Sequence, residues 1–176
     1  MRADDPQLRP LHLLRHPLSD AGGRTKVIGI GNAWRSDDGA GLAVARLLDG
    51  TLPDGVEVLE REGEPTGLID AWEGAGAVWL VDAVSSGAQP GTVHRHDASS
   101  VSLPAALFDT STHHMGLAEA VELARALGRL PQTTIVYGIE GANFDTGETL
   151  SSAVEAAAAR VADAVRGEVA QCTRRR

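Results

Sequence analysis

Short apolar runs alternate along the chain with stretches of helical periodicity. Val27–Ile28–Gly29–Ile30 and residues 77–81 are apolar and rich in β-branched residues, which is typical of strands that are buried on both faces. Residues 91–96 are more polar and predict a strand near a sheet edge. The predicted strands span residues 27–30, 56–60, 77–81, 91–96 and 133–139.

Amphipathic segments separate these strands. Leu42, Ala45 and Leu48 fall on one helical face, and Val154, Ala158, Val161 and Val165 form a similar stripe. The predicted helices span residues 39–49, 67–74, 116–128 and 151–166. This alternation predicts an α/β fold in three layers, in which a mainly parallel, twisted sheet of about five strands carries helices on both faces.

The length of the chain predicts one domain. With 176 residues, of which 43% are hydrophobic, it can bury one full core but hardly two. We expect a single α/β domain over residues 26–167. The first 25 residues contain Pro6, Pro10 and Pro17 and predict a flexible extension, and residues 168–176 end in three arginines and predict a loose tail.

Charge and cysteine content exclude several classes of protein. The chain has 16 basic and 24 acidic residues and a formal net charge of -8, which argues against a sequence-independent nucleic-acid binder. The single cysteine, Cys172, excludes a disulfide framework and a thiolate zinc cluster. Because no run has the length of a membrane span or the pattern of a signal peptide, we expect a cytoplasmic protein without membrane contact.

The glycine-rich turn after the first strand only partly matches the dinucleotide-binding fingerprint. Gly29 and Gly31 fit, but Trp34 replaces the third glycine, which permits close packing of helix and strand. Asp37 and Asp38 stand at the helix entrance, where they would repel a pyrophosphate. Capping of the helix is the simplest role for these aspartates, and one can cap while the other points into a cleft.

Three polar side chains form a candidate metal site. Asp38 follows the first strand, Asp82 ends the third, and His113 and His114 precede a helix. Because the carboxyl ends of parallel strands meet at one sheet edge, two carboxylates and one imidazole could hold a divalent metal there. A turn-forming role for Asp82 is equally open, and an exposed structural role is the default for either histidine. The residues alone do not choose between His113 and His114.

Several short blocks in order resemble the hydrogenase maturation proteases, the endopeptidases that trim the large subunit of nickel-iron hydrogenases. The likeness covers roughly residues 26–166. Ala33, Trp34 and Gly141 depart from the family pattern, and we interpret them as adaptation to a particular hydrogenase. The blocks read IGIGN (28–32), RSDDGAG (35–41), VDA (81–83), PGT (90–92), STH (111–113), the helix over 117–127, and YGIE (137–140).

The resemblance implies both a function and a ligand set. Matched motif to motif, the family's nickel ligands fall on Asp38, Asp82 and His113 rather than His114. The implied reaction removes the C-terminal extension of a hydrogenase large subunit precursor after nickel insertion. The nickel is carried by the substrate, so no tightly held cofactor is expected. No residue is assigned as the attacking group, and hydrolysis is expected to proceed through the metal ligands. The protein is expected to be a monomer.

Three other functions fit part of the pattern. A non-enzymatic binding or chaperone module could dock a metallated partner in the same cleft. A Rossmann-type nucleotide-binding oxidoreductase finds some support in Gly29, Gly31 and Glu60, which follows the second strand. A self-contained metallohydrolase would keep its own zinc.

Overall fold

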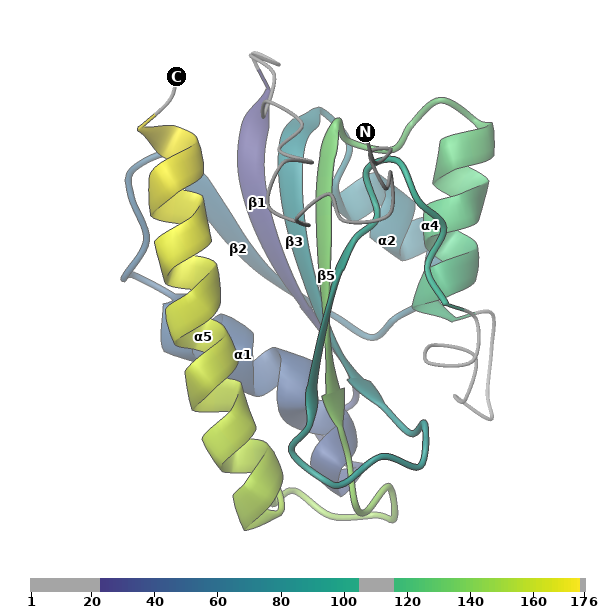
Figure 1. Cartoon of the computed structure of the whole chain (residues 1–176), viewed down its shortest axis with the longest axis vertical. Helices are drawn as coiled ribbons and strands as arrows, with labels where there is room; N and C mark the ends of the chain where they lie inside the picture. The colour runs from purple at the N-terminus through teal and green to yellow at the C-terminus, as the bar shows by residue number, and fades with distance from the viewer. Residues whose placement is uncertain (1–22, 105–115, 175–176) are drawn as a thin grey trace, which may run out of the picture.

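In the described ranges, residues 23–104 and 116–174 of a computed structural model, five strands form a central sheet with helices on both faces (Figure 1). The strand order is β2-β1-β3-β5-β4. The neighbours β2, β1, β3 and β5 are parallel, and β4 pairs antiparallel with β5 at the edge. The strands are β1 (Arg24–Ile30), β2 (Val56–Arg61), β3 (Ala75–Val84), β4 (Val93–Asp97) and β5 (Thr133–Glu140).

The helices form the two outer layers. On one face, α1 and α5 bury Val44, Leu48 and Val161 against Trp79 of the sheet. On the other face, α2 and α4 cover a second apolar cluster built around Leu80. The helices are the short 3-10 helix η2 (Ser36–Gly39), α1 (Ala40–Leu48), α2 (Pro65–Ala71), α4 (Leu117–Ala126) and α5 (Ser152–Thr173).

This architecture confirms the predicted α/β fold with three layers and a mainly parallel sheet. The helix predicted to end at Arg166 is longer than expected. It continues to Thr173 as α5, because Val169 and Cys172 are buried in the core. A loose tail starting at residue 168 is therefore wrong for residues 168–173. Gly167 weakened the helical signal at this point, since glycine is a poor helix former.

The last turns of α5 are tied to the sheet by Glu168. Its Oε1 accepts hydrogen bonds from Arg95 Nε (2.7 Å) and from the Tyr137 hydroxyl (2.8 Å), and its Oε2 accepts one from Trp79 Nε1 (2.8 Å). These three partners lie on β3, β4 and β5. One carboxylate thus joins the helix to three strands.

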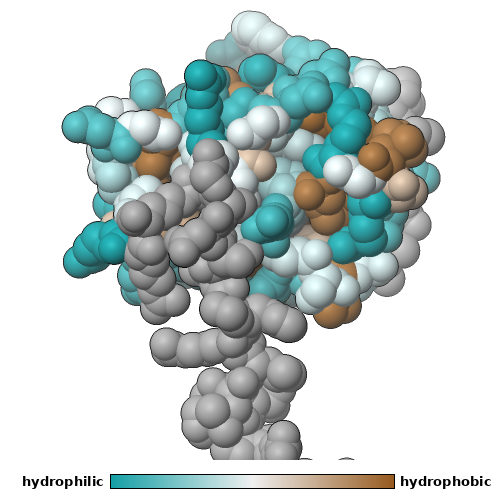
Figure 2. Space-filling model, turned by 90° about the horizontal axis from the view of Figure 1, so that it is seen from above, coloured by the Kyte–Doolittle hydropathy of each residue, from teal (hydrophilic) through white to brown (hydrophobic). Residues whose placement is uncertain are grey.

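None of the helices in the described ranges is long and apolar enough to cross a membrane. Figure 2 looks down on the edge at which the parallel strands begin. Polar residues cover most of the visible surface there, and hydrophobic residues interrupt them mainly on the α4 side.

Candidate functional site

The glycine-rich turn brings α1 close to the ends of β1 and β3. A Cβ atom on Gly41, in the first turn of α1, would lie 2.2 Å from the Val81 carbonyl oxygen and 2.3 Å from that of Ile30. Gly31 has φ +147°, and a Cβ there would overlap the Asp38 carbonyl oxygen. Gly41 therefore provides the close helix–strand approach for which the fingerprint's third glycine was missing. The same packing places Asp38 beside the end of β3.

Asp38 lies in η2, at the carboxyl edge of the sheet. Its Oδ2 accepts a hydrogen bond from the backbone N–H of Asn32 (3.2 Å) and lies 3.8 Å from Nη1 of Arg35. Burial raises the pKa of the Asp38 carboxyl above its ordinary value, although Arg35 and the Asn32 N–H oppose this shift. Asp38 does not cap α1, since the N-cap of that helix is Gly39.

Asp82 stands near the end of β3 and interacts electrostatically with Asp38. Burial raises its pKa to about 8, and the negative charge of Asp38 contributes to the rise. The hydrogen bond from the Ala83 N–H to Oδ1 (2.8 Å) works in the opposite direction. The charge of Asp38 thus makes Asp82 harder to ionise, and a cation bound between the two carboxylates would remove this repulsion. This donor set suits a divalent metal with oxygen ligands.

Asp37, the neighbour of Asp38, has a structural role. It is fully buried, and its carboxylate accepts four hydrogen bonds at 2.6–3.0 Å from Ala142, Asn143 and Ser151. Burial alone would raise the pKa of Asp37, but these hydrogen bonds outweigh it and lower the pKa. Asp37 therefore fixes the loop between β5 and α5, whereas Asp38 faces the site.

A second polar group lies on the same face of the sheet as Asp82. Gly138 of β5 pairs with Asp82 on one side and with His94 of β4 on the other. The buried Glu140 accepts hydrogen bonds from the Ser86 hydroxyl (2.7 Å) and the Gly87 N–H (2.9 Å). His94 Nε2 approaches Glu140 Oε2 to 3.5 Å without forming a hydrogen bond.

His94 and His96 have no predicted role, and Glu140 enters the predictions only as part of the YGIE motif. The spacing of the two histidines on a strand, which places both on one sheet face, was the available signal. Burial lowers the pKa of His96, and the proximity of His94 lowers it further. The two imidazoles are therefore close together beside the site.

His113 and His114 lie outside the described residues, so the predicted three-ligand site stays a prediction. Within residues 23–104 and 116–174, no three His, Cys, Asp or Glu side chains gather into a group that could hold a metal ion. The structure brings Asp38 and Asp82 together.

The groups that would bind a nucleotide form hydrogen bonds and ion pairs within the protein instead. The Asn32 N–H of the glycine-rich turn is bonded to the Asp38 carboxylate rather than open to a phosphate. Glu60, which would have to meet a ribose, forms a two-pronged ion pair with Arg46 at 2.9 Å. These contacts argue against the Rossmann-type oxidoreductase.

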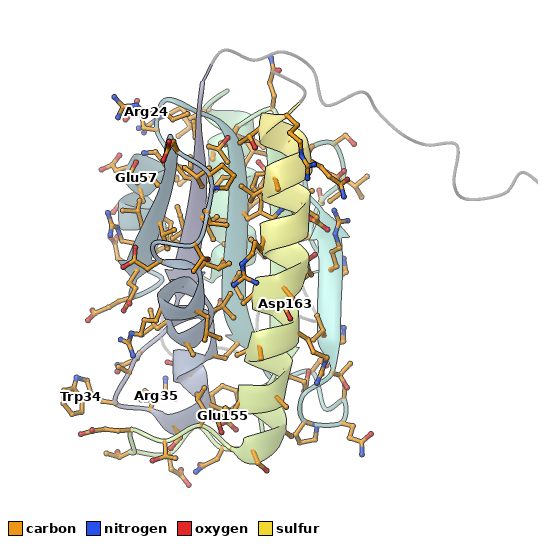
Figure 3. The ribbon with its side chains drawn as sticks, turned by 90° about the vertical axis from the view of Figure 1, so that its left-hand side faces the viewer. Arg24, Trp34, Arg35, Glu57, Glu155 and Asp163 are labelled. Carbon is orange, nitrogen blue, oxygen red and sulfur yellow. The ribbon has the colours of Figure 1, made fainter. Side chains whose placement is uncertain are left out.

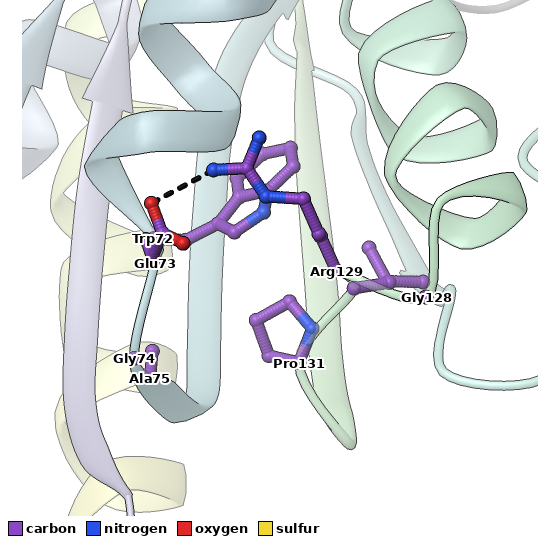
Figure 4. Close-up of a pocket in the computed structure, with 8 residues that line it drawn as sticks. Trp72, Glu73, Gly74, Ala75, Gly128, Arg129 and Pro131 are labelled. Atoms are coloured by element: carbon purple, nitrogen blue, oxygen red, sulfur yellow. Dashed lines mark hydrogen bonds and ion pairs between the residues drawn. The ribbon is translucent and has the colours of Figure 1, made fainter.

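A separate hollow lies at the opposite edge of the sheet. It has a volume of about 280 Å³ and lies between the end of α2 and the loop before β5 (Figure 4). Trp72 lines it, with its buried Nε1 lacking a hydrogen bond, and Arg129 bonds Glu73 across it at 2.7 Å. None of the predicted site residues that the structure describes belongs to this hollow.

Fold and site together define an α/β protein with two interacting carboxylates, Asp38 and Asp82, at the carboxyl edge of a mainly parallel sheet. The sequence model of the hydrogenase maturation protease family (HycI) matches residues 43–168. The chain belongs to the hydrogenase maturation protease family.

Relatives in sequence and in structure agree with this assignment. The chain is 28% identical over 121 residues to the hydrogenase expression/formation protein HupD of Thiocapsa roseopersicina, covering 68% of this chain and 55% of HupD. It is 29% identical over 133 residues to HoxM of Azotobacter vinelandii, covering 74% and 64% of the two chains. The alignments with these two relatives thus span a little over half to just under two thirds of the relatives' own length.

Solved structures match more completely. The hydrogenase maturation protease HybD from Thermococcus kodakarensis superposes with a TM-score of 0.67 at 28% identity, covering 83% of this chain and 99% of that one. The hydrogenase maturating endopeptidase HybD from E. coli gives a TM-score of 0.71 over 84% and 93%. At 22% identity, this second match supports the fold alone.

Proposed function

We propose that this protein is an endopeptidase that removes the C-terminal extension of a nickel-iron hydrogenase large subunit precursor after nickel has been inserted. Family membership supports the reaction class. The single observation that carries the proposal is the pair of interacting carboxylates, Asp38 and Asp82, at the carboxyl edge of the sheet, where open α/β folds bind their ligands.

This pair explains how the enzyme would distinguish a loaded precursor from an empty one. Without a cation, Asp82 resists ionisation because of its burial and of the charge on Asp38. Nickel carried by the substrate would neutralise both carboxylates and add a charge-assisted term to binding. A precursor without metal would gain nothing from this term. We therefore expect recognition of the metal to control selectivity.

Asp38, Asp82 and His113 are the proposed ligands on the protease side. Leu117, the first residue of α4, is buried in the cluster that contains Leu80 and Val84 of β3. The first turn of α4 lies toward the carboxyl edge of the sheet (Figure 1). His113 precedes Leu117 by four residues in the sequence. Two oxygens and one nitrogen from the protease would leave positions open for ligands of the substrate.

The catalytic group is not assigned to a separate residue. We propose that hydrolysis acts through the metal ligands. Nickel belongs to the substrate, so the protease is expected to need no resident cofactor. We further propose a cytoplasmic monomer, for which the acidic composition and the single cysteine are the support.

Mass spectrometry of the precursor tests this function. Purified protein incubated with nickel-loaded precursor is expected to reduce the precursor's mass by that of its C-terminal extension. The metal-free precursor is expected to stay intact. A stable complex without mass loss would instead establish a binding module. If the protein neither binds nor cleaves any candidate large subunit, the assignment is refuted.

A further inference from the structure

Trp34 is an exposed aromatic residue on a fixed backbone. Its side chain is 66% exposed and is the only aromatic one among the exposed large hydrophobic residues of the described ranges. Its backbone N–H donates to Asn32 Oδ1 (2.9 Å), and its carbonyl accepts from the Gly147 N–H (2.9 Å). Figure 3 shows the indole projecting away from the body of the protein. Such a residue contributes little to the fold and is already positioned to contact something else.

The position of Trp34 relates it to the site. It lies in the same loop as Asp38, whose carboxylate accepts the N–H of Asn32, the residue that also holds the Trp34 backbone. The loop between β5 and α5 is bonded to this turn through Gly147, which accepts from the Ser36 N–H at 2.7 Å. A protein chain that reaches Asp38 from outside would therefore pass close to the indole.

The loops at this edge of the sheet are rich in acidic residues. In the three loops that follow β1, β2 and β5, Arg35 is the only basic residue, and it is directed to Asp38. Asp145 and Glu148 are exposed on the loop that is bonded to the Trp34 backbone. The carboxylates of these three loops belong to Asp37, Asp38, Glu62, Glu64, Asp145 and Glu148.

We propose that Trp34, together with Asp145 and Glu148, is the docking point for the precursor protein and takes a basic side chain, Lys or Arg, from the segment that flanks the metal. An aromatic face attracts a cation, and the neighbouring carboxylates add to that attraction. A rigid, exposed tryptophan loses little entropy when it becomes buried, which is why tryptophan is common among the residues that dominate binding. This proposal rests on the proposed function, and it names the surface through which the substrate is selected.

The test compares cleavage of nickel-loaded precursor by wild type and by Trp34→Ala. The variant is expected to raise KM about tenfold with kcat unchanged. Trp34→Phe is expected to recover most of the loss, and Trp34→Arg, which keeps a long side chain but repels a basic segment, to lose at least as much as alanine. Leu127→Ala, which truncates a side chain of similar exposure (57%) at the end of α4, is the matched control and is expected to leave KM unchanged.

The contribution of Asp145 and Glu148 is tested separately by the salt dependence of KM. For wild type, KM is expected to rise with salt concentration, because screening weakens the attraction between the carboxylates and the basic segment. The double variant Asp145→Asn, Glu148→Gln is expected to have a higher KM at low salt and a flatter salt dependence. An unchanged salt dependence in that variant would remove these carboxylates from the proposal.

The outcomes separate the docking proposal from the proposed function. If wild type cleaves the precursor and Trp34→Ala has the same KM and thermal midpoint, docking at Trp34 is wrong and the protease assignment stands. If wild type does not cleave, the assignment fails, and docking is then judged by the dissociation constants of the same precursor from the two proteins. A dimer of this chain that forms at high concentration and is lost in Trp34→Ala, with KM unchanged, would assign the indole to a second copy instead.

Discussion

The carboxylate of Asp37 accepts hydrogen bonds from both the backbone N–H (2.6 Å) and the hydroxyl (3.0 Å) of Ser151, the residue that precedes α5. The same carboxylate holds the N–H groups of Ala142 and Asn143. One buried aspartate thereby fixes the start of the longest helix against the loop that carries Asp38. Asp37 and Asp38 are adjacent in the chain, but only the second faces the site.

Asp37→Asn is expected to destabilise the protein by about 2–3 kcal/mol. All four hydrogen bonds of the Asp37 carboxylate are accepted from N–H or O–H donors. An asparagine amide would point its NH₂ group at some of these donors and leave buried polar groups without partners. Urea unfolding followed by circular dichroism measures the loss. A variant as stable as wild type would show that the four hydrogen bonds do not hold the loop.

Asp38→Asn is the matched comparison on the next residue. The Asp38 carboxylate accepts one hydrogen bond, from the Asn32 N–H, and its Oδ2 lies 3.8 Å from Arg35 Nη1. The unfolding free energy of the variant is therefore expected to stay within about 0.5 kcal/mol of wild type. Processing of nickel-loaded precursor is expected to be abolished, because the amide removes a negative ligand. Equal losses of stability and activity in Asp38→Asn would favour a structural role for this residue too.

Asp82→Asn is expected to abolish processing and to raise the stability of the metal-free protein at alkaline pH. The folded state raises the pKa of Asp82 to about 8, mainly through burial and also through Asp38. The folded protein thus holds a proton that the unfolded chain releases near pH 4. The stability that this proton provides is complete below about pH 4 and is lost as the pH rises through 8.

The variant removes this pH dependence. Its melting temperature is expected to match that of wild type near pH 4 and to exceed it by about 2–4 °C at pH 9, the shift that 1 kcal/mol produces in a domain of this size. Water screens part of the cost, since Asp82 is partly exposed. The exposed Asp54→Asn serves as control and should show no such trend. A constant difference between wild type and Asp82→Asn at all pH values would contradict the assignment.

Glu168→Gln is expected to cost about 2–3 kcal/mol at pH 7, because it weakens hydrogen bonds from Arg95, Trp79 and Tyr137 to a charged acceptor. Although burial alone would raise the pKa of Glu168, these bonds lower it below its ordinary value. The stability from its ionised form is therefore complete above about pH 4.5 and is lost as the pH falls through the lowered folded pKa.

Urea unfolding at pH 7, 5 and 3 measures this dependence. The difference between wild type and Glu168→Gln is expected to shrink toward the lowest pH. Glu155→Gln, an exposed change in the same helix, is expected to follow wild type throughout. A difference that stays constant down to pH 3 would mean that the charge of Glu168 does not contribute.

The fold could be predicted from the sequence because its strands are buried on both faces. Val27 to Ile30 and residues 77–81 have no polar alternation to obscure them, and the helices between them carry regular apolar stripes. The end of α5 could not be predicted in this way. Gly167 interrupts the local pattern, and the burial of Val169 and Cys172 depends on contacts with distant strands.

The site residues could be predicted from the sequence only where their position at the end of a strand determines their place in the fold. Asp38 and Asp82 follow strands whose carboxyl ends meet, so their proximity follows from the topology. The role of Asp37 could not be foreseen, because its partners lie more than a hundred residues later in the chain. The contact between His94 and Glu140 depends on the pairing of the antiparallel β4, which no local pattern specifies. His113 remains a prediction.

Gly41→Ala is expected to impair stability and processing together, in contrast to Asp82→Asn. The added Cβ would lie 2.2 Å from the Val81 carbonyl oxygen and 2.3 Å from that of Ile30, so α1 must move away from the backbone of two strands. Overpacking of this kind typically costs about 1–3 kcal/mol, and the shift displaces Asp38, which precedes α1 directly. Gly167→Ala is the control: its Cβ meets nothing within 4 Å in α5, and helix propensity should stabilise it by up to about 1 kcal/mol. A Gly41→Ala variant with wild-type melting temperature and cleavage rate would show that close contact between α1 and the sheet does not position the site.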